Sequence, residues 1–175
     1  MKRSLKILFF FFVCAQTSDA QTKTYVIDIN ASGVSFNVSH LGVLNVQGSF
    51  KDFEGELDFK ENTLSAIRAV ISTQSIFSDD KSRDKTLRSE SYLDVDTYPK
   101  IEFKSDKIEA SSNKVSGGLT IKNETRPIVL SLQISKSKRI ISLSTQISRK
   151  KFNLEFGSMN SLIGDIVEID VRIKY

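Results

Sequence analysis

Apolar and polar residues alternate along most of this chain, from Thr24 to Tyr175, and this period of two constrains the fold more than any other feature. Val34, Phe36 and Val38 alternate with small polar residues, which is typical of a strand with one buried face. The same alternation recurs at 57–59, 67–71, 101–103, 115–121, 128–134, 141–147 and 167–173. Turn-forming residues separate these segments. The pattern therefore predicts nine or ten short strands in an all-β sandwich or barrel.

Residues 79–94 interrupt the alternation, because they are rich in charged residues and contain few β-branched ones. We expect one or two short helices here, capped near Asp79 and Ser89, with Leu87, Tyr92 and Leu93 facing inward. Such an insertion either covers one end of a barrel or is an ordinary crossover connection.

The first 20 residues have the composition of an export signal. Basic residues precede an apolar block at 7–15, and the small residues Ser18 and Ala20 predict cleavage before Gln21. This block is shorter than the roughly 20 residues that a membrane span needs, and no later segment is continuously apolar. We therefore expect the mature chain, residues 21–175, to be a single domain that is periplasmic or secreted and is not an integral membrane protein.

The composition limits the chemistry. The chain has one histidine and one cysteine, and Cys14 leaves with the signal, so no metal site and no catalytic residue is predicted. The net charge is only +4, and basic residues are interspersed with acidic ones, so nucleic-acid binding is not expected. We expect the basic runs at 136–139 and 149–151 to be solvated, because both lie beside turns.

Three polar residues are candidates for contacts to a ligand. His40 lies at a strand end, and its structural interpretation is a ring that ties down a loop by hydrogen bonds. Arg83 and Asp84 lie in the insertion, where they either contact a ligand head group or form a local salt bridge.

Apolar side chains of the strands and the insertion form either a filled core or the wall of a cavity that holds one slender ligand. The candidate wall residues are Phe36, Val38, Phe50, Phe53, Leu57, Ile71, Leu87, Leu93, Phe103, Leu119 and Ile121.

Several motifs occur in an order that resembles the YceI-like family. They include an aromatic-x-Ile-Asp stretch at 25–28, a Gly-x-Phe-x-x-Phe-x-Gly stretch at 48–55, the insertion with its following strand at 83–105, and a hairpin at 118–128. The resemblance covers residues 24–175. The chain departs from the family at Ala31 and Thr86, where many members have histidine.

The resemblance implies an eight-stranded, antiparallel, lipocalin-like β-barrel with an interior tunnel for an isoprenoid or another long-chain lipid. We therefore expect a binding protein without a cofactor beyond such a lipid, rather than an enzyme, and the sequence is compatible with a homodimer. The alternatives are an interaction or stress-response barrel with a filled core, and a small hydrolase that depends on His40.

Overall fold

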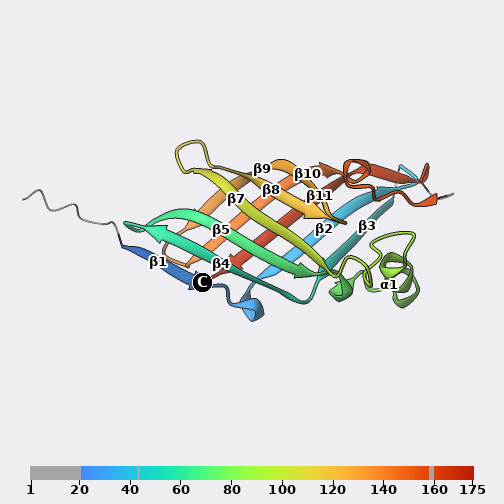
Figure 1. Cartoon of the computed structure of the whole chain (residues 1–175), viewed down its shortest axis with the longest axis horizontal. Coiled ribbons are helices and arrows are strands. Elements are labelled where there is room, and N and C mark those ends of the chain that lie inside the picture. The colour runs from blue at the N-terminus through green and yellow to red at the C-terminus, as the bar shows by residue number, and fades with distance from the viewer. Residues whose placement is uncertain (1–20, 43, 158–159) are drawn as a thin grey trace, which may run out of the picture.

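The computed structural model describes residues 21–42, 44–157 and 160–175, so the signal expected at 1–20 lies outside the described residues. Eleven strands of the described chain form one antiparallel sheet in the order β1-β4-β5-β7-β8-β9-β10-β11-β2-β3-β6 (Figure 1). They are β1 (Thr22–Val26), β2 (Gly33–His40), β3 (Leu44–Phe50), β4 (Phe53–Lys60), β5 (Thr63–Ser72), β6 (Ile76–Phe77), β7 (Lys100–Glu109), β8 (Lys114–Ile121), β9 (Glu124–Ser135), β10 (Ile140–Ser148) and β11 (Ile163–Lys174).

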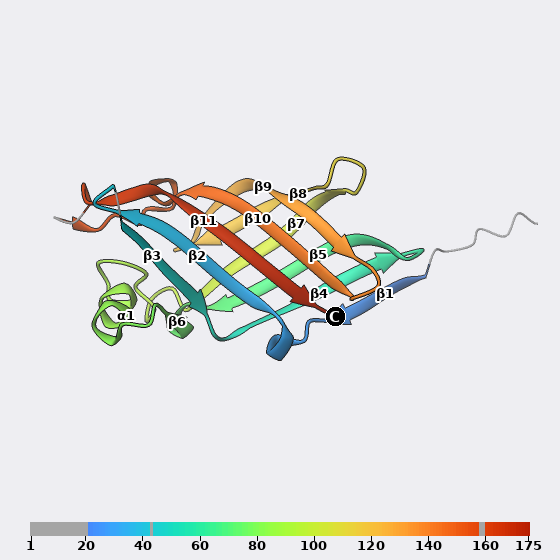
Figure 2. The same ribbon diagram turned by 180° about the vertical axis from the view of Figure 1, so that it is seen from behind.

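The sheet curls into the barrel that the family resemblance implies (Figures 1 and 2). A hydrogen bond joins parts that are distant in the strand order. The Asp28 N–H, just after β1, donates to the Lys174 carbonyl of β11 over 2.8 Å. The described chain has eleven strands rather than eight, and two of the additional ones are the short edge strands β1 and β6.

Alternation places one face of each strand inside the barrel. Along β8, Val115, Gly117, Leu119 and Ile121 are buried, whereas the residues between them are partly exposed. Because side chains of a strand point alternately to its two faces, this spacing produces a continuous apolar interior.

The interior differs between the two ends of the barrel. One end of the barrel carries the β4–β5, β7–β8 and β9–β10 turns, and we call it the closed end. A cluster of apolar side chains, which includes Leu57 and Phe59, fills it. Tyr25, Phe59 and Tyr175 contact one another there, with ring centroids 5.2–5.4 Å apart. The opposite end, which carries the insertion, we call the open end (Figure 1).

The insertion contains one α-helix, α1 (Lys81–Arg88), and short 3-10 turns occur at η1 (Ile29–Ala31), η2 (Thr73–Ser75) and η3 (Arg149–Phe152). The helix is capped by Asp80, whose carboxylate accepts the Arg83 N–H over 2.9 Å. Of the one or two helices expected, the described insertion has one, and no second helix begins near Ser89. Ser89 instead ends α1, because its N–H and its hydroxyl both donate to the Thr86 carbonyl.

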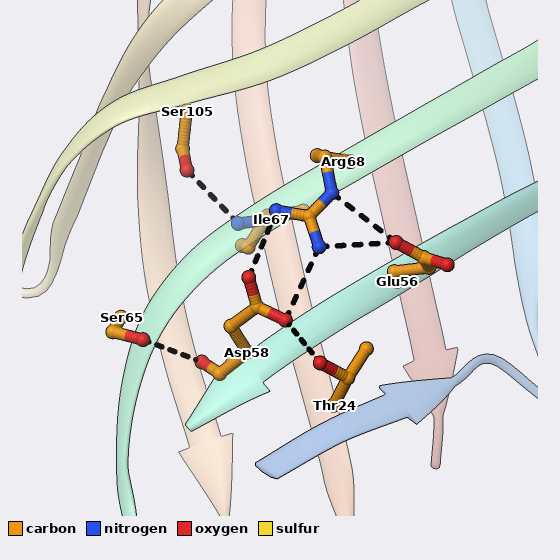
Figure 3. Close-up of polar contacts among 7 residues, drawn as sticks. All are labelled: Thr24, Glu56, Asp58, Ser65, Ile67, Arg68 and Ser105. Carbon is orange, nitrogen blue, oxygen red and sulfur yellow. Dashed lines mark hydrogen bonds and ion pairs between the residues drawn. The ribbon is translucent and has the colours of Figure 1, made fainter. Parts of the chain in front are cut away.

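A polar cluster on the outer wall connects β1, β4 and β5 (Figure 3). Arg68 donates to Asp58 over 2.8 and 3.1 Å and to Glu56 over 3.0 and 3.2 Å. The Thr24 hydroxyl donates to the same Asp58 carboxylate over 2.7 Å. Because three strands contribute, the cluster supports the register of the edge strand β1 against β4.

Candidate functional site

The interior of the barrel contains a cavity of about 520 Å³ that extends from the closed end to α1 and is partly open to solvent. Its wall is almost entirely apolar. Side chains from β2, β3, β5 and β7–β11 form it, and residues of the insertion contribute where the cavity reaches the open end. Such a space suits a ligand that is itself apolar, since apolar burial contributes about 25 cal/mol per Å².

Most of the apolar candidates line this cavity. They are Phe36, Val38, Phe50, Ile71, Leu87, Leu93, Phe103, Leu119 and Ile121. Leu57 does not, because it packs in the solid cluster of the closed end. Phe53 does not either, and it borders a hollow on the outer wall instead. Alternation assigned both to the correct buried face, but it does not distinguish packed core from cavity wall.

Two glycines allow aromatic rings of the wall to lie close to the backbone. The Phe36 ring occupies the space above Gly48, its partner in the β2–β3 ladder. The Phe103 ring similarly lies against Gly117 of the adjacent strand β8. A side chain at either glycine would overlap the ring, so the absence of a Cβ shapes the cavity.

The polar candidates lie near the open end but have different surroundings. His40 lines the cavity, yet its Nε2 is buried and has no hydrogen-bond partner among the described residues. The hydrogen bonds expected to tie a loop are therefore not made by this atom. Arg83 also lines the cavity, where its Nε donates to the Ser78 hydroxyl over 2.9 Å.

Asp84 is buried away from the cavity. Its Oδ1 accepts the Ser78 N–H over 2.8 Å and the Ser78 hydroxyl over 2.6 Å. Arg83 and Asp84 thus both anchor α1 to the residue that follows β6, so their observed contacts fix the insertion in place.

Arg149 is the polar wall residue that sequence reasoning missed. We expected the run 149–151 to be solvated, and Lys150 and Lys151 are exposed, but Arg149 is only 1% exposed. Its guanidinium donates five hydrogen bonds of 2.6–2.9 Å to carbonyl oxygens of Leu154, Asn160, Ile163 and Gly164 and to the Asn160 side chain. Burial lowers the pKa of Arg149, although an arginine remains charged at neutral pH.

Other wall residues were present in the sequence pattern but were not selected. The alternating apolar residues of β9, β10 and β11 complete the wall, including Ile128, Leu130, Leu143, Ile147, Val167, Ile169, Val171 and Ile173. Period-two alternation places these residues on the inward face, as it does the apolar wall candidates of β2–β8. Tyr92 was expected to face inward, and it lines the cavity. Phe156, in contrast, lies in a loop, where no periodicity could have marked it.

A second hollow, of about 510 Å³, lies on the outer wall across β9, β10, β11, β2 and β3. Five of its residues are cross-strand partners in adjacent strands and form a row across the sheet: Ser131, Ser144, Asp170, Ser35 and Ser49. The row is polar, so this hollow does not suit an apolar ligand, and the interior cavity is the stronger candidate.

In the part of the chain that the structure describes, no helix has the length and apolar character that crossing a bilayer requires. The same described residues contain no group of three or more His, Cys, Asp or Glu side chains placed to bind a metal ion.

Comparison with known proteins places this chain among related sequences. The family model described as the YceI-like domain matches residues 25–175. A UPF0312 protein of Vibrio parahaemolyticus is 34% identical over 140 residues, which cover 76% of this chain and 74% of that protein. A UPF0312 protein of Pseudomonas syringae pv. tomato is 34% identical over 137 residues, covering 74% and 71%, respectively.

Two solved structures share the fold. The protein BcnA of Burkholderia cenocepacia superposes with a TM-score of 0.76 at 24% identity, covering 84% of this chain and 98% of BcnA. A polyisoprenoid-binding domain from Saccharophagus degradans, implicated in plant cell wall breakdown, superposes with a TM-score of 0.65 at 18% identity, covering 85% and 95%. At these identities the likeness concerns the fold alone.

Proposed function

Because this chain belongs to the YceI-like domain family, we propose that it is a binding protein that sequesters or carries a long apolar ligand in its barrel. The ligand is of the isoprenoid or fatty-acyl type. The observation that carries the proposal is the apolar interior cavity of about 520 Å³, which lies within the range of roughly 300–1,000 Å³ typical of small-molecule sites.

The asymmetry of the barrel supports a chain-like ligand that enters from one end. The closed end is filled by a packed cluster around Leu57 and Phe59, whereas the cavity reaches the insertion at the open end. A flexible chain lies with its tail toward the closed end, and any polar group of the ligand then lies near His40 and Arg83. The structural neighbour from Saccharophagus degradans, named a polyisoprenoid-binding domain, is consistent with a ligand of this class.

Binding rather than catalysis fits the chemistry of the wall. A hydrolase would use His40 as its base, and such a base needs an acidic group that orients the ring. Among the described residues no carboxylate hydrogen-bonds to either ring nitrogen of His40, and its buried Nε2 has no hydrogen-bond partner. We therefore propose that the protein acts without a catalytic residue and without a cofactor beyond the bound lipid.

The proposed location is the periplasm or the exterior of the cell. It rests on the basic and apolar character of residues 1–20, with cleavage before Gln21. A carrier in an aqueous compartment would shield an apolar chain from water, which is the free-energy source for binding in an apolar cavity.

The direct test is organic extraction of the purified protein followed by mass spectrometry. We expect a long-chain molecule to co-purify. A protein that contains no extractable lipid and does not take up a fluorescent fatty-acyl probe would favour a filled interaction barrel over the proposed carrier.

Two variants separate binding from catalysis. Phe103→Arg places a charge in the apolar wall, where it can neither hydrate nor pair, so retention of the ligand should be lost. His40→Ala removes at most one hydrogen bond, worth about 0.5–1.5 kcal/mol, so retention should change little. Circular dichroism verifies that both variants fold. Full retention in the Phe103 variant, together with complete loss in the His40 variant, would contradict the proposal.

A further inference from the structure

Leu41 occupies a backbone conformation that rarely holds an apolar side chain. Ten non-glycine residues of the described chain have positive φ, and nine of them carry a polar or charged side chain. Leu41, with φ of 55°, is the exception. The left-handed conformation disfavours leucine, whereas asparagine and aspartate tolerate it. Packing in the core does not explain why a leucine occupies this position, since Leu41 is 52% exposed.

Two further exposed leucines lie beside it. The Leu41 N–H donates to the Leu162 carbonyl over 2.7 Å, and Leu162 is 37% exposed. Leu44 begins β3, pairs with His40 and is 56% exposed. Leu41 thus lies in the β2–β3 connection, Leu44 at the start of β3 and Leu162 in the segment before β11. Together we call these three residues the leucine rim.

The leucine rim continues the wall of the cavity toward solvent. His40 and Ile163 are partners in the β2–β11 ladder, and both line the cavity. Leu41 directly follows His40, and Leu162 directly precedes Ile163. The rim therefore lies at the open end of the barrel, where the β2–β3 connection and the segment before β11 meet (Figure 2).

We propose that the leucine rim docks on the surface of a phospholipid bilayer, so that the open end of the barrel faces the membrane when an apolar ligand enters or leaves. This role rests on the proposed carrier function. Exposed apolar side chains at a protein's edge bind the interface of a bilayer in proportion to the apolar area they bury. A bilayer also requires no complementary shape from the three exposed side chains.

A second copy of the chain is a poorer occupant. A stable interface uses about 20–30 residues on each side, whereas the rim offers three side chains. Positive charge beside the rim does not supply an attraction to the bilayer either. Exposed Lys150 lies next to Asp165, whose carboxylate accepts the Lys150 N–H, and exposed Lys151 and Glu155 lie in the same loop. Apolar contact carries the docking, so it should persist on zwitterionic lipid and at high salt.

The test is co-flotation of the purified protein with phosphatidylcholine vesicles in low and high salt. We expect the wild-type protein to float at both salt concentrations. The double variant Leu41→Asn/Leu44→Ser should lose at least about tenfold in partitioning, because two exposed leucine side chains are removed. A matched control, Val26→Ser/Val129→Ser, removes exposed apolar side chains away from the rim, 71% and 54% exposed, and should float like the wild type.

Two additional measurements make the outcome specific. Leu41→Asn alone should raise the melting temperature, because asparagine suits the left-handed backbone, so loss of flotation is not loss of folding. Lipid content, measured by extraction, should be the same in all variants.

Wild-type protein that contains lipid but does not float, or a double variant that floats fully, would overturn the docking proposal alone. Protein that floats through its rim but holds no lipid would instead overturn the carrier function. A dimer in analytical ultracentrifugation that the double variant abolishes, without flotation of the wild type, would assign the rim to a second copy and refute the bilayer.

Discussion

The Phe156 ring stacks on the Tyr92 ring, with centroids 4.4 Å apart and planes inclined by 20°. Phe156 lies in the connection between β10 and β11, and Tyr92 lies in the connection between α1 and β7. Both rings line the cavity, and the guanidinium of Arg149 lies 4.6 Å from the centroid of Phe156. The stack therefore joins two loops across the open end.

Removal of this stack should accelerate ligand release. An aromatic pair contributes about 0.5–1.5 kcal/mol beyond its buried area, so Phe156→Ala should raise the dissociation rate of a fluorescent fatty-acyl probe about two- to tenfold. Stopped-flow measurement with an excess of competing lipid gives this rate. Phe77→Ala is the control, because Phe77 is exposed on β6 outside the cavity wall. Equal release rates in all three proteins would show that the stack does not restrict exit.

Arg149 should be essential for the stability of the open end. Arg149→Lys keeps the charge but loses the planar fork that donates to five acceptors, several of which then remain buried and unpaired. We expect the free energy of unfolding to fall by about 2–4 kcal/mol, measured by urea denaturation. Arg126→Lys changes an exposed arginine in an ion pair with Glu124 and should cost less than about 1 kcal/mol. A small effect at Arg149 would mean that water replaces the lost donors.

Two adjacent glycines of β8 should respond differently to alanine. A Cβ at Gly117 would overlap the Lys104 carbonyl oxygen and approach Ser105 Cα, both of which belong to the backbone of β7. At Gly118 the nearest atom is the Thr125 Cγ2 at 3.3 Å, which is the end of a side chain. We expect Gly117→Ala to lower the free energy of unfolding by about 1–3 kcal/mol and Gly118→Ala to change it by less than about 1 kcal/mol. Similar urea midpoints for both variants would disprove the close approach of β7 and β8.

The outer cluster around Asp58 should make the stability depend on pH in acid. Hydrogen bonds from Arg68 and Thr24 hold the pKa of Asp58 below its usual value (Figure 3). A carboxyl whose pKa is lower in the folded state stabilises the fold above its unfolded-state pKa of about 3.9, and this contribution is lost as the pH falls through the folded-state pKa. The wild type should therefore be more stable than Asp58→Asn at pH 7, and the difference should shrink below about pH 4.

Arg68→Gln provides the control for this prediction. This variant removes the hydrogen bonds from Arg68, which are the main cause of the lowered pKa of Asp58. The Asp58 carboxyl, followed by NMR, should therefore titrate at a higher pH than in the wild type. A difference between wild type and Asp58→Asn that stays constant from pH 7 to pH 3 would contradict the assignment.

The sequence by itself determined which face of each strand is apolar and where most turns lie. Leu57 and Leu119 were both assigned to the interior, and both are buried. This succeeds because side-chain direction in a strand is local, with a period of two that each segment displays on its own. The insertion was also visible locally, although Ser89 ends α1 rather than beginning a second helix.

Only the tertiary structure decided which of the inward residues enclose space. Leu57 packs in the closed end and Leu119 lines the cavity, since the difference depends on which distant strands converge at each end. The same holds for the run 149–151. The alternation at 141–147 is in phase with Arg149 and not with Lys150, but it does not reveal the carbonyls that accept the hydrogen bonds of Arg149, which come from residues up to 15 positions away. Chain folding brings those acceptors together. Their hydrogen bonds to the guanidinium offset the cost of removing its charge from water, whereas Lys150, which has no such set of acceptors, stays solvated.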